Sequence, residues 1–340
     1  MDMTQFFPVM LAGFAAAVGF TPITKRLAVV LGVLDQPSAR KVHQNPTPLM
    51  GGLAIYGALV LALLLFSPPF YLVELGAILA GATWLVLVGF VDDRRGMQPL
   101  VKLGGQTIAA IVLVLAGIQV RIFPSQALNV TFTLLWIVGI INAMNFQDNM
   151  DGLAAGITAI ASITFFVMAV QQELSLVGSM AAALGGASIG FLIYNFNPAS
   201  SFMGDMGSMV LGFLLAVLAI KLDFRVPAER QVVTWMVPVV VLGLPIFDTV
   251  LVTLTRLIEG RSPMVGGKDH TSHRLVSLGL SQRAAVLALY AVCAALGFAA
   301  VQLSHASISE GATIGAGLAV AAAVAFVFLN WAYLRNRRRA

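Results

Sequence analysis

The chain has 340 residues, of which 59% are hydrophobic and 10% charged, and its formal net charge is +5. This composition excludes a soluble globular protein, and the basic balance does not indicate nucleic-acid binding, because basic residues beside membrane spans are ordinary in membrane proteins. The single cysteine, Cys293, excludes an intrachain disulfide. Long apolar runs without period-two alternation predict helices and not a membrane β-barrel.

The predicted fold is all-α, a polytopic membrane helix bundle that forms one domain over residues 1–340. The first apolar segment has no basic residues before it and no small-residue cleavage site, so we interpret it as a retained span. Pro238 and Pro245 fall in the ninth span and predict a broken helix. The roughly eleven expected spans are residues 6–31, 49–67, 71–91, 101–117, 131–146, 153–170, 175–194, 208–221, 232–257, 284–304 and 312–334.

Lysine and arginine are divided unequally between the two sides that this count defines. Of the 20 basic residues, 16 lie on the side that the odd-numbered spans reach. The positive-inside rule assigns that side to the cytoplasm, so we expect a multi-pass membrane protein whose odd-numbered spans end on the cytoplasmic side. The exceptions on the other side are Arg121, Lys221, Arg225 and Arg230.

The first of five polar segments on the predicted cytoplasmic side, residues 35–52, places Lys41 and His43 beside the membrane. A proline-rich turn and the pair Gly51-Gly52 follow. Lysine holds phosphate groups, and glycine permits a close backbone approach. A positive-inside loop with a turn is the alternative interpretation.

The second polar segment, residues 89–96, contains the adjacent carboxylates Asp92 and Asp93. Neighbouring side chains on a helix point about 100° apart, so we expect the two carboxylates to have different roles. One carboxylate would face Mg²⁺ or act as a base, and the other would orient a neighbour. An acidic end of a span, paired with Arg94 or Arg95, is the alternative.

The third polar segment has a polar residue at every third position where a span ends: Asn142, Asn145, Asp148 and Asp151. Amides and carboxylates suit Mg²⁺ coordination or hydrogen bonds to a nucleobase. A helix end that turns at Gly152 would bring them to one place. A cluster that caps the helix is the alternative.

The fourth polar segment, residues 195–208, contains Asn195, Phe202 and Asp205. A carboxylate between glycines at the start of a span is placed for a hard cation that shares phosphate oxygens. Phe202 offers a ring on which a base can stack. Capping of the following helix by Asp205 explains the same pattern.

The fifth polar segment places His270, His273 and Arg274 after a glycine pair. These side chains predict a cationic lid that suits a diphosphate better than a metal, because Mg²⁺ prefers oxygen ligands. A solvated charged loop is the alternative. Asp248, in the run Pro-Ile-Phe-Asp, is expected to be a buried, hydrogen-bonded structural acid, and a role in the site is the alternative.

The joint occurrence of the five segments, in this order, resembles the polyprenyl-phosphate N-acetylhexosamine-1-phosphate transferases, which belong to glycosyltransferase family 4. The resemblance covers about residues 35–275. It is closer to the branch that transfers GlcNAc 1-phosphate than to the phospho-MurNAc-pentapeptide translocases. Thr271 and Ser272 separate two histidines where the translocase branch carries adjacent ones, and Asn149 replaces the glycine usual in the third motif.

The resemblance implies an enzyme dependent on Mg²⁺, with Mn²⁺ as a substitute. It would transfer N-acetylhexosamine 1-phosphate, with GlcNAc favoured, from a UDP-sugar to undecaprenyl phosphate, release UMP and start a cell-envelope glycan. It implies catalytic roles for Asp92, Asp93 and Asp148, and metal binding by Asp205 and Asn145. A homodimer stays open, and no nucleic-acid partner is expected. The implied substrate contacts are Lys41, His43, Asn142, Asn145, Asp151, Asn195, Phe202, His270, His273 and Arg274.

Two other functions fit this sequence less well. Asp148-x-x-Asp151-Gly152 begins like the motif of CDP-alcohol phosphotransferases, but the further acids of that motif are missing before Glu173. A transporter would show two similar halves and polar groups near mid-bilayer, whereas this chain has no visible internal repeat and its acids lie at span ends.

Overall fold

The computed structural model describes residues 2–36, 46–66, 72–222 and 235–337. They belong to two compact units, unit 1 (Met1–Leu222) and unit 2 (Asp223–Ala340), and each is described by itself. The single domain expected over the whole chain stays a prediction.

Unit 1 is a bundle of helices with one short antiparallel sheet, in which β1 (Leu34–Asp35) pairs with β2 (Thr47–Pro48). Its helices are η1 (Met3–Phe6), α1 (Phe7–Leu31), α2 (Gly51–Phe66), α3 (Leu72–Arg95), α4 (Pro99–Leu115), α5 (Gln126–Gln147), α6 (Leu153–Gln171), α7 (Ser175–Asn195) and α8 (Gly204–Lys221).

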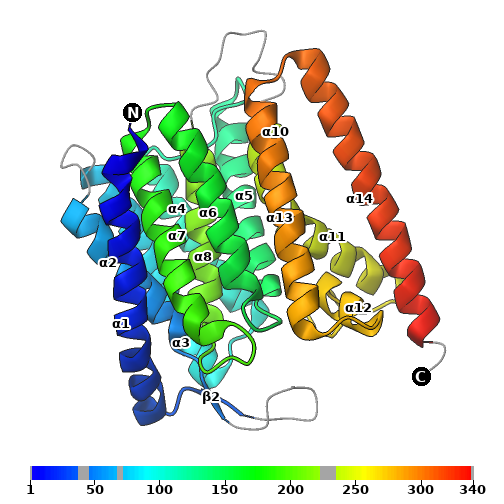
Figure 1. Ribbon diagram of the computed structural model, residues 1–340, viewed down its shortest axis with the longest axis horizontal. Helices are drawn as coiled ribbons and strands as arrows, with labels where there is room; N and C mark the ends of the chain where they lie inside the picture. Colours follow the sequence, from blue (N-terminus) through cyan, green and yellow to red (C-terminus); the bar gives the residue numbers. More distant parts are fainter. Residues whose placement is uncertain (1, 37–45, 67–71, 223–234, 338–340) are drawn as a thin grey trace. The chain divides into compact units, whose positions relative to one another are not determined.

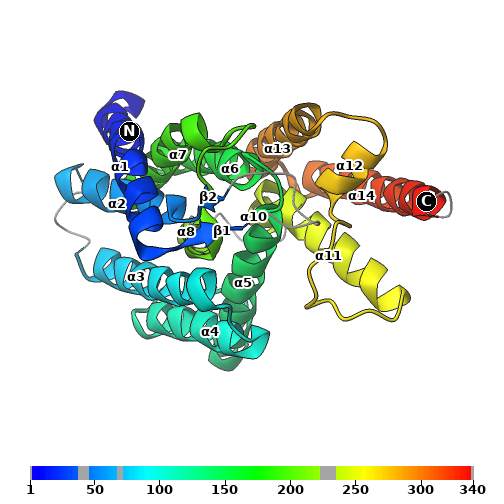
Figure 2. The same cartoon turned by 90° about the horizontal axis from the view of Figure 1, so that it is seen from below.

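Helix α8 forms the centre of unit 1 and packs against α2, α3 and α5 (Figures 1 and 2). Every residue from Met206 to Ala219 is buried. A helix that is apolar on all its sides belongs in the interior of a bundle. The core of this unit therefore surrounds α8, and the first turn of α8 carries Asp205.

Glycines bring the first turn of α8 into backbone contact with two neighbouring helices. A β-carbon added at Gly52 of α2 would lie 2.2 Å from the α-carbon of Gly207. One added at Gly89 of α3 would lie 2.2 Å from the α-carbon of Met206. Small residues at helix interfaces permit such close approach inside membranes. Gly52 and Gly89 therefore allow the first turn of α8 to pack closely between α2 and α3.

The opposite end of unit 1 contains an ion pair. Lys221, at the end of α8, lies 2.5 Å from Glu74 in the first turn of α3. This contact explains one of the basic residues that did not fit the predicted sidedness. Arg225 and Arg230 lie outside the described residues.

Unit 2 contains two short helices in place of the ninth span. Leu242, at φ −94° and ψ 19°, separates α10 (Met236–Val241) from α11 (Gly243–Ile258), so the predicted broken helix is confirmed. Pro245 falls in the first turn of α11, where the missing N–H of proline is tolerated. The other helices of unit 2 are α12 (Thr271–Ser277), α13 (Gln282–His305) and α14 (Ile308–Arg337).

The multi-pass helical fold is confirmed. Among the described residues, eight helices are long and apolar enough to span a membrane, and α2 and α4 are shorter apolar helices. Together with the broken α10–α11 pair they match the expected spans. Three helices begin four or more residues earlier in the chain than predicted: α5 at Gln126, α8 at Gly204 and α14 at Ile308.

Candidate functional site

Four helices of unit 1 bring polar side chains together around Lys102, near the start of α4. Its Nζ lies 2.9 Å from Asp92 Oδ2 on α3 and 2.9 Å from Asp205 Oδ1 on α8. It also donates a hydrogen bond of 3.4 Å to Asn145 Oδ1 on α5. The side chains of Asp92 and Lys102 are 10% and 16% exposed, and that of Asp205 is 29% exposed. We call these four residues the lysine cluster.

Asn145 orients the carboxylate of Asp205 from the side of α5. Its Nδ2 donates to Asp205 Oδ1, the same oxygen that contacts Lys102, and to Ser208 Oγ at 2.8 Å. A carboxylate held by an ammonium and an amide has a fixed orientation. The cluster is therefore preorganised before any substrate binds.

Asp93 has a different set of partners from its neighbour Asp92. Its Oδ1 accepts a hydrogen bond of 2.8 Å from the backbone N–H of Asp205, and its Oδ2 accepts one of 3.2 Å from that of Met206. The residue before the helix, Met203, makes no side-chain cap. Capping of α8 thus falls to Asp93 and not to Asp205, and the two adjacent carboxylates divide as their helical spacing predicts. Their chemical roles stay predictions.

Asn142 lies one turn below Asn145 on α5 and faces α4. Its Nδ2 donates to Gln106 Oε1 at 2.6 Å, and Gln106 Nε2 lies 3.4 Å from Asn142 Oδ1. Gln106 is fully buried. The structure therefore places Asn142 in an amide pair with α4, and its predicted contact with substrate stays a prediction.

Asp148 follows the end of α5 and makes no hydrogen bond or ion pair through its carboxylate with any described residue. Burial raises the pKa of this carboxyl to about 8, and the negative charges of Asp205, Asp151 and Asp35 add to the effect. A carboxylate in such a negative environment attracts a cation. Asp148 is thus suited to a charged ligand or a proton.

Asp151 and Asn195 connect the loops that follow α5 and α7. Asp151 Oδ2 accepts hydrogen bonds of 3.0 Å from Asn197 Nδ2 and from the backbone N–H of Ala199. Asn195, 2% exposed, accepts one from Gly152 N at 3.2 Å. Both predicted substrate contacts therefore hold the loop architecture in this structure.

Phe202 lies in the loop that these contacts hold, and its backbone joins β2 and α2. Its N–H donates to Pro48 O at 2.8 Å, and its carbonyl accepts from Gly51 N at 2.9 Å. The ring is half-buried. Lys41 and His43, the predicted contacts of the first segment, lie outside the described residues.

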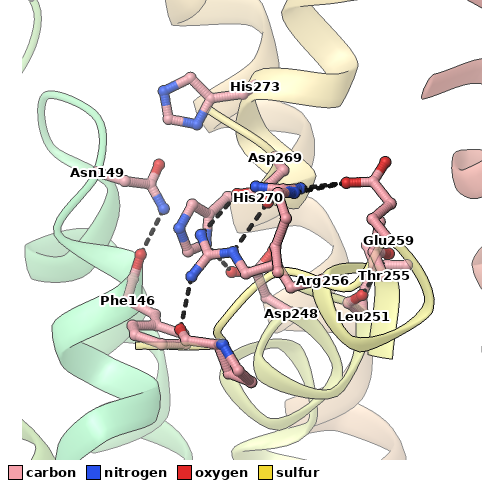
Figure 3. Close-up of polar contacts among 12 residues, drawn as sticks. Phe146, Asn149, Asp248, Leu251, Thr255, Arg256, Glu259, Asp269, His270 and His273 are labelled. Carbon is pink, nitrogen blue, oxygen red and sulfur yellow. Dashed lines mark hydrogen bonds and ion pairs between the residues drawn. The ribbon is translucent and has the colours of Figure 1, made fainter. Parts of the chain in front are cut away.

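Residues 270–274 of unit 2, which we call the histidine segment, are held by buried Asp248 of α11 (Figure 3). Asp248 Oδ2 lies 2.7 Å from His270 Nδ1, and Asp248 Oδ1 accepts the N–H of Thr271 at 2.6 Å. The expected buried, hydrogen-bonded acid is confirmed. A carboxylate on one ring nitrogen fixes the orientation of the ring, so the other nitrogen of His270 has a defined direction.

Asp269 forms a buried ion pair next to this contact. Arg256 Nη2 lies 2.7 Å from Asp269 Oδ1, and Arg256 Nε donates to Asp269 Oδ2 at 2.9 Å. Burial alone would raise the pKa of Asp269, but the Arg256 guanidinium outweighs it and lowers the pKa to about 2. The pair stays ionised and anchors the loop before α12.

His273 and Arg274 differ from the cationic lid that the sequence predicts. Burial, with the nearby charges of His270 and Lys268, lowers the pKa of His273 to about 4, so its ring is neutral near pH 7. Arg274 is 1% exposed, and each of its three guanidinium nitrogens donates to a protein oxygen. The structure commits Arg274 to the protein interior, and its predicted phosphate contact stays a prediction.

Comparison with known proteins decides the family. Residues 75–223 match the sequence model of glycosyl transferase family 4. The chain is 37% identical over 297 residues to a probable undecaprenyl-phosphate N-acetylglucosaminyl 1-phosphate transferase of Bacillus subtilis. The aligned region covers 85% of this chain and 82% of the relative. The chain belongs to glycosyl transferase family 4.

Other relatives of this family 4 protein carry related names. It is 34% identical over 336 residues to a decaprenyl-phosphate N-acetylglucosaminephosphotransferase of Mycolicibacterium smegmatis, covering 88% of this chain and 83% of the relative. It is 33% identical over 237 residues to a phospho-N-acetylmuramoyl-pentapeptide-transferase of Heliobacterium modesticaldum, and the alignment covers 61% of this chain and 72% of the relative. The chain is therefore a membrane phospho-sugar transferase. Residues 75–223, which match the family model, contain all four residues of the lysine cluster.

Sequence reasoning missed Lys102 in this family 4 protein, because it counted the residue only toward the positive-inside balance. The available signal was its position: a lysine inside an apolar segment, followed at once by Gly104 and Gly105. Charge inside a span is costly and usually functional. Gln106 and Ser208, the partners of Asn142 and Asn145, were missed as well, since only tertiary structure pairs them.

The oxygen donors of the lysine cluster fit a hard cation. Within the described residues, no group of three or more His, Cys, Asp and Glu side chains is arranged to hold a metal ion. Asp92, Asp205 and Asn145 nevertheless direct oxygens at one point, which the Lys102 ammonium takes in this structure. Carboxylate and amide oxygens are the ligands that Mg²⁺ prefers, so the donor set fits magnesium.

Proposed function

We propose that this protein transfers GlcNAc 1-phosphate from UDP-GlcNAc to undecaprenyl phosphate, releasing UMP and starting a cell-envelope glycan. The convergence of Asp92, Lys102, Asn145 and Asp205 within the family-matched region supports the proposal most. The names of the Bacillus and Mycolicibacterium relatives point to the same sugar and to polyprenyl phosphates as acceptors.

The proposed reaction exchanges one phosphoanhydride bond at the sugar-linked phosphorus for another. An oxygen of the lipid phosphate attacks the sugar-linked β-phosphorus of the UDP-sugar, and a new P–O bond forms there. The bond between that phosphorus and the oxygen bridging to the α-phosphate breaks, and UMP leaves with the electron pair. Three anionic phosphates meet in the transition state, so the main demand on the protein is neutralisation of negative charge.

The lysine cluster supplies that neutralisation in our proposal. The Lys102 ammonium, already placed between two carboxylates, can move toward an incoming phosphate oxygen. Asp205 and Asn145 would hold Mg²⁺, with Mn²⁺ as a substitute, and the bound ion would stabilise charge on the diphosphate. Asp93 keeps Asp205 in place through the first turn of α8. Asp92 and Asp148 are proposed to have catalytic roles at the lipid phosphate.

The lipid acceptor explains why these residues lie at helix ends. A polyprenyl chain stays in the bilayer, so its phosphate is presented at the membrane surface. We propose that this surface is the cytoplasmic side of the inner membrane, where the sugar nucleotide is available and where the predicted charge balance places the site. A homodimer stays a prediction.

A panel of sugar nucleotides tests the proposal. Purified protein in nanodiscs, with undecaprenyl phosphate and Mg²⁺, is given UDP-GlcNAc, UDP-GalNAc, UDP-glucose or UDP-MurNAc-pentapeptide, and UMP and lipid-linked sugar are measured. We expect equal amounts of both products with UDP-GlcNAc, loss of turnover with EDTA and its return with Mn²⁺. Turnover with none of the four would contradict the reaction, and preference for the pentapeptide substrate would contradict the proposed sugar.

A further inference from the structure

The last helix of unit 2 is mostly uncovered by protein. In the most apolar stretch of α14, 6% of the residues are buried. Apart from Gly311 near its start, the buried residues between Ile308 and Arg335 are Leu329 and Ala332. Both lie in the final turns, where α14 meets α12 and α11 (Figure 1). The protein contacts of α14 are thus concentrated at the end beside the histidine segment.

Two side chains from these final turns contact Arg274 of α12. Asn330 Oδ1 accepts a hydrogen bond of 2.8 Å from Arg274 Nη1 and lies 2.8 Å from Thr255 Oγ1. The Arg274 guanidinium also lies over the ring of Tyr333, 4.6 Å from its centroid. Asn330 Nδ2 donates to the carbonyl of Phe326 at 3.1 Å, which fixes the orientation of the amide.

The remaining donors of Arg274 tie α12 to the rest of unit 2. Its Nε donates to the carbonyl of Asp269 at 2.7 Å, and its Nη2 donates to Thr255 Oγ1 of α11 at 2.9 Å. A buried guanidinium is tolerated only while its donors have partners. Removal of the Asn330 acceptor would leave a buried charge partly unsatisfied, and the segment that carries Arg274 would have to move.

The histidine segment therefore has two anchors, one on each side of Ser272. Asp248 holds His270 and the N–H of Thr271 from α11. Arg274, adjacent to His273, is held from α14 through Asn330 and Tyr333. The direction of both imidazoles depends on these anchors being in place together.

We infer that the end of α14 positions the histidine segment for phospho-sugar transfer, and that Asn330 is a positioning residue acting through Arg274. This inference rests on the proposed function, together with the prediction that His270 and His273 contact the substrate.

The test compares variants at Asn330 with a matched control on the same helix. Asn330→Ala removes the acceptor, Asn330→Asp keeps an oxygen toward Arg274, and Val324→Ala changes a residue that is 64% exposed. We expect kcat/KM for UDP-GlcNAc to fall about tenfold in Asn330→Ala, to recover to within about threefold of the parent in Asn330→Asp, and to be unchanged in Val324→Ala. Hydrogen exchange of residues 270–276 should be faster in Asn330→Ala alone.

Two results for the Asn330 variants would overturn the inference. Folded Asn330→Ala protein with the parent's KM, kcat and exchange rates would overturn the inference, as would equal losses in the alanine and aspartate variants. If the alanine variant does not fold, Tyr333→Leu, which removes the ring under the guanidinium, is compared with Tyr333→Phe, which keeps it. Equal activity in these two variants would also overturn the inference.

The same experiment separates this inference from the proposed function. If the parent protein releases no UMP from any sugar nucleotide, the proposed function fails. If the parent turns over and Asn330→Ala matches Val324→Ala, only the positioning role fails. The exchange measurement needs no substrate, so it tests the anchor in either case.

Discussion

The Lys102 ammonium lies between the carboxylates of Asp92 and Asp205. Replacing Lys102 with methionine leaves Asp92 and Asp205 without the ammonium that now lies 2.9 Å from each. We expect Lys102→Met to lower the rate of UMP release at least about a hundredfold, because a preorganised charge partner of the phosphates is lost. Lys102→Arg keeps the charge and should retain part of the rate. Activity of Lys102→Met within threefold of the parent would contradict this role.

Asp93 and Asp92 allow a comparison of two adjacent carboxylates. Asp93 caps the first turn of α8 with both oxygens, whereas Asp92 contacts Lys102. Loss of a helix cap costs about 1 kcal/mol, and leaves buried N–H groups unpaired. We expect Asp93→Ala to lower the Tm of the detergent-solubilised protein more than Asp92→Ala does. Equal shifts in the two variants would show that the cap is unimportant for stability.

His273 makes stability depend on pH in a defined window. Its ordinary pKa is 6.5, and burial lowers it to about 4 in the folded protein. Between these values the unfolded chain binds more protons, so the free energy of unfolding falls as pH falls through the window. The charges near it are Asp248, Lys268, Asp269 and His270.

The measurement for His273 is the Tm of the parent and of His273→Gln between pH 7 and pH 5. We expect the parent to lose more stability on acidification than the variant, which has no imidazole to protonate. The pKa of Asp269, lowered to about 2, matters only below this range. Parallel pH profiles for the two proteins would show that His273 is not buried as described.

At the scale of elements, the placement of α8 depends on glycine contacts that a methyl group would break. Gly89→Ala would put a β-carbon 2.2 Å from a backbone atom of α8, while Gly76→Ala on the same helix meets nothing within 4 Å. Overpacking costs about 1–3 kcal/mol and would displace Asp205. We expect Gly89→Ala to lower both Tm and UMP release, and Gly76→Ala to leave both unchanged. Equal behaviour of the pair would argue against a tight α3–α8 contact.

The helix starts show what local sequence cannot reveal. The start of α5 is polar, a pattern typical of a loop. In the structure Asn129 is buried, where its Oδ1 accepts from the N–H of Phe123 at 2.9 Å and its Nδ2 donates to the Phe123 carbonyl at 3.0 Å. The start of α8 is capped from α3 by Asp93. The first contact joins residues six apart, and the second comes from a distant helix. Hydropathy registers neither, so it places both boundaries too late.

For the whole molecule, hydropathy predicts the class of fold because a bilayer requires long apolar helices, and Pro238 and Pro245 predict the broken ninth helix. The acids at span ends also predict where polar groups gather. Hydropathy does not predict which of those groups meet. Lys102 resembles a flanking charge and Arg274 resembles a phosphate contact, and only tertiary packing places the first in the cluster and buries the second.

The rate of UMP release by Asp205→Asn tests the account most directly. Its matched control is Glu74→Gln, which removes a carboxylate from the opposite end of unit 1. With UDP-GlcNAc, undecaprenyl phosphate and Mg²⁺, we predict that Asp205→Asn loses at least about a hundredfold in rate while Glu74→Gln stays near the parent. Magnesium-dependent UMP release by Asp205→Asn at the parent's rate would contradict the proposed site.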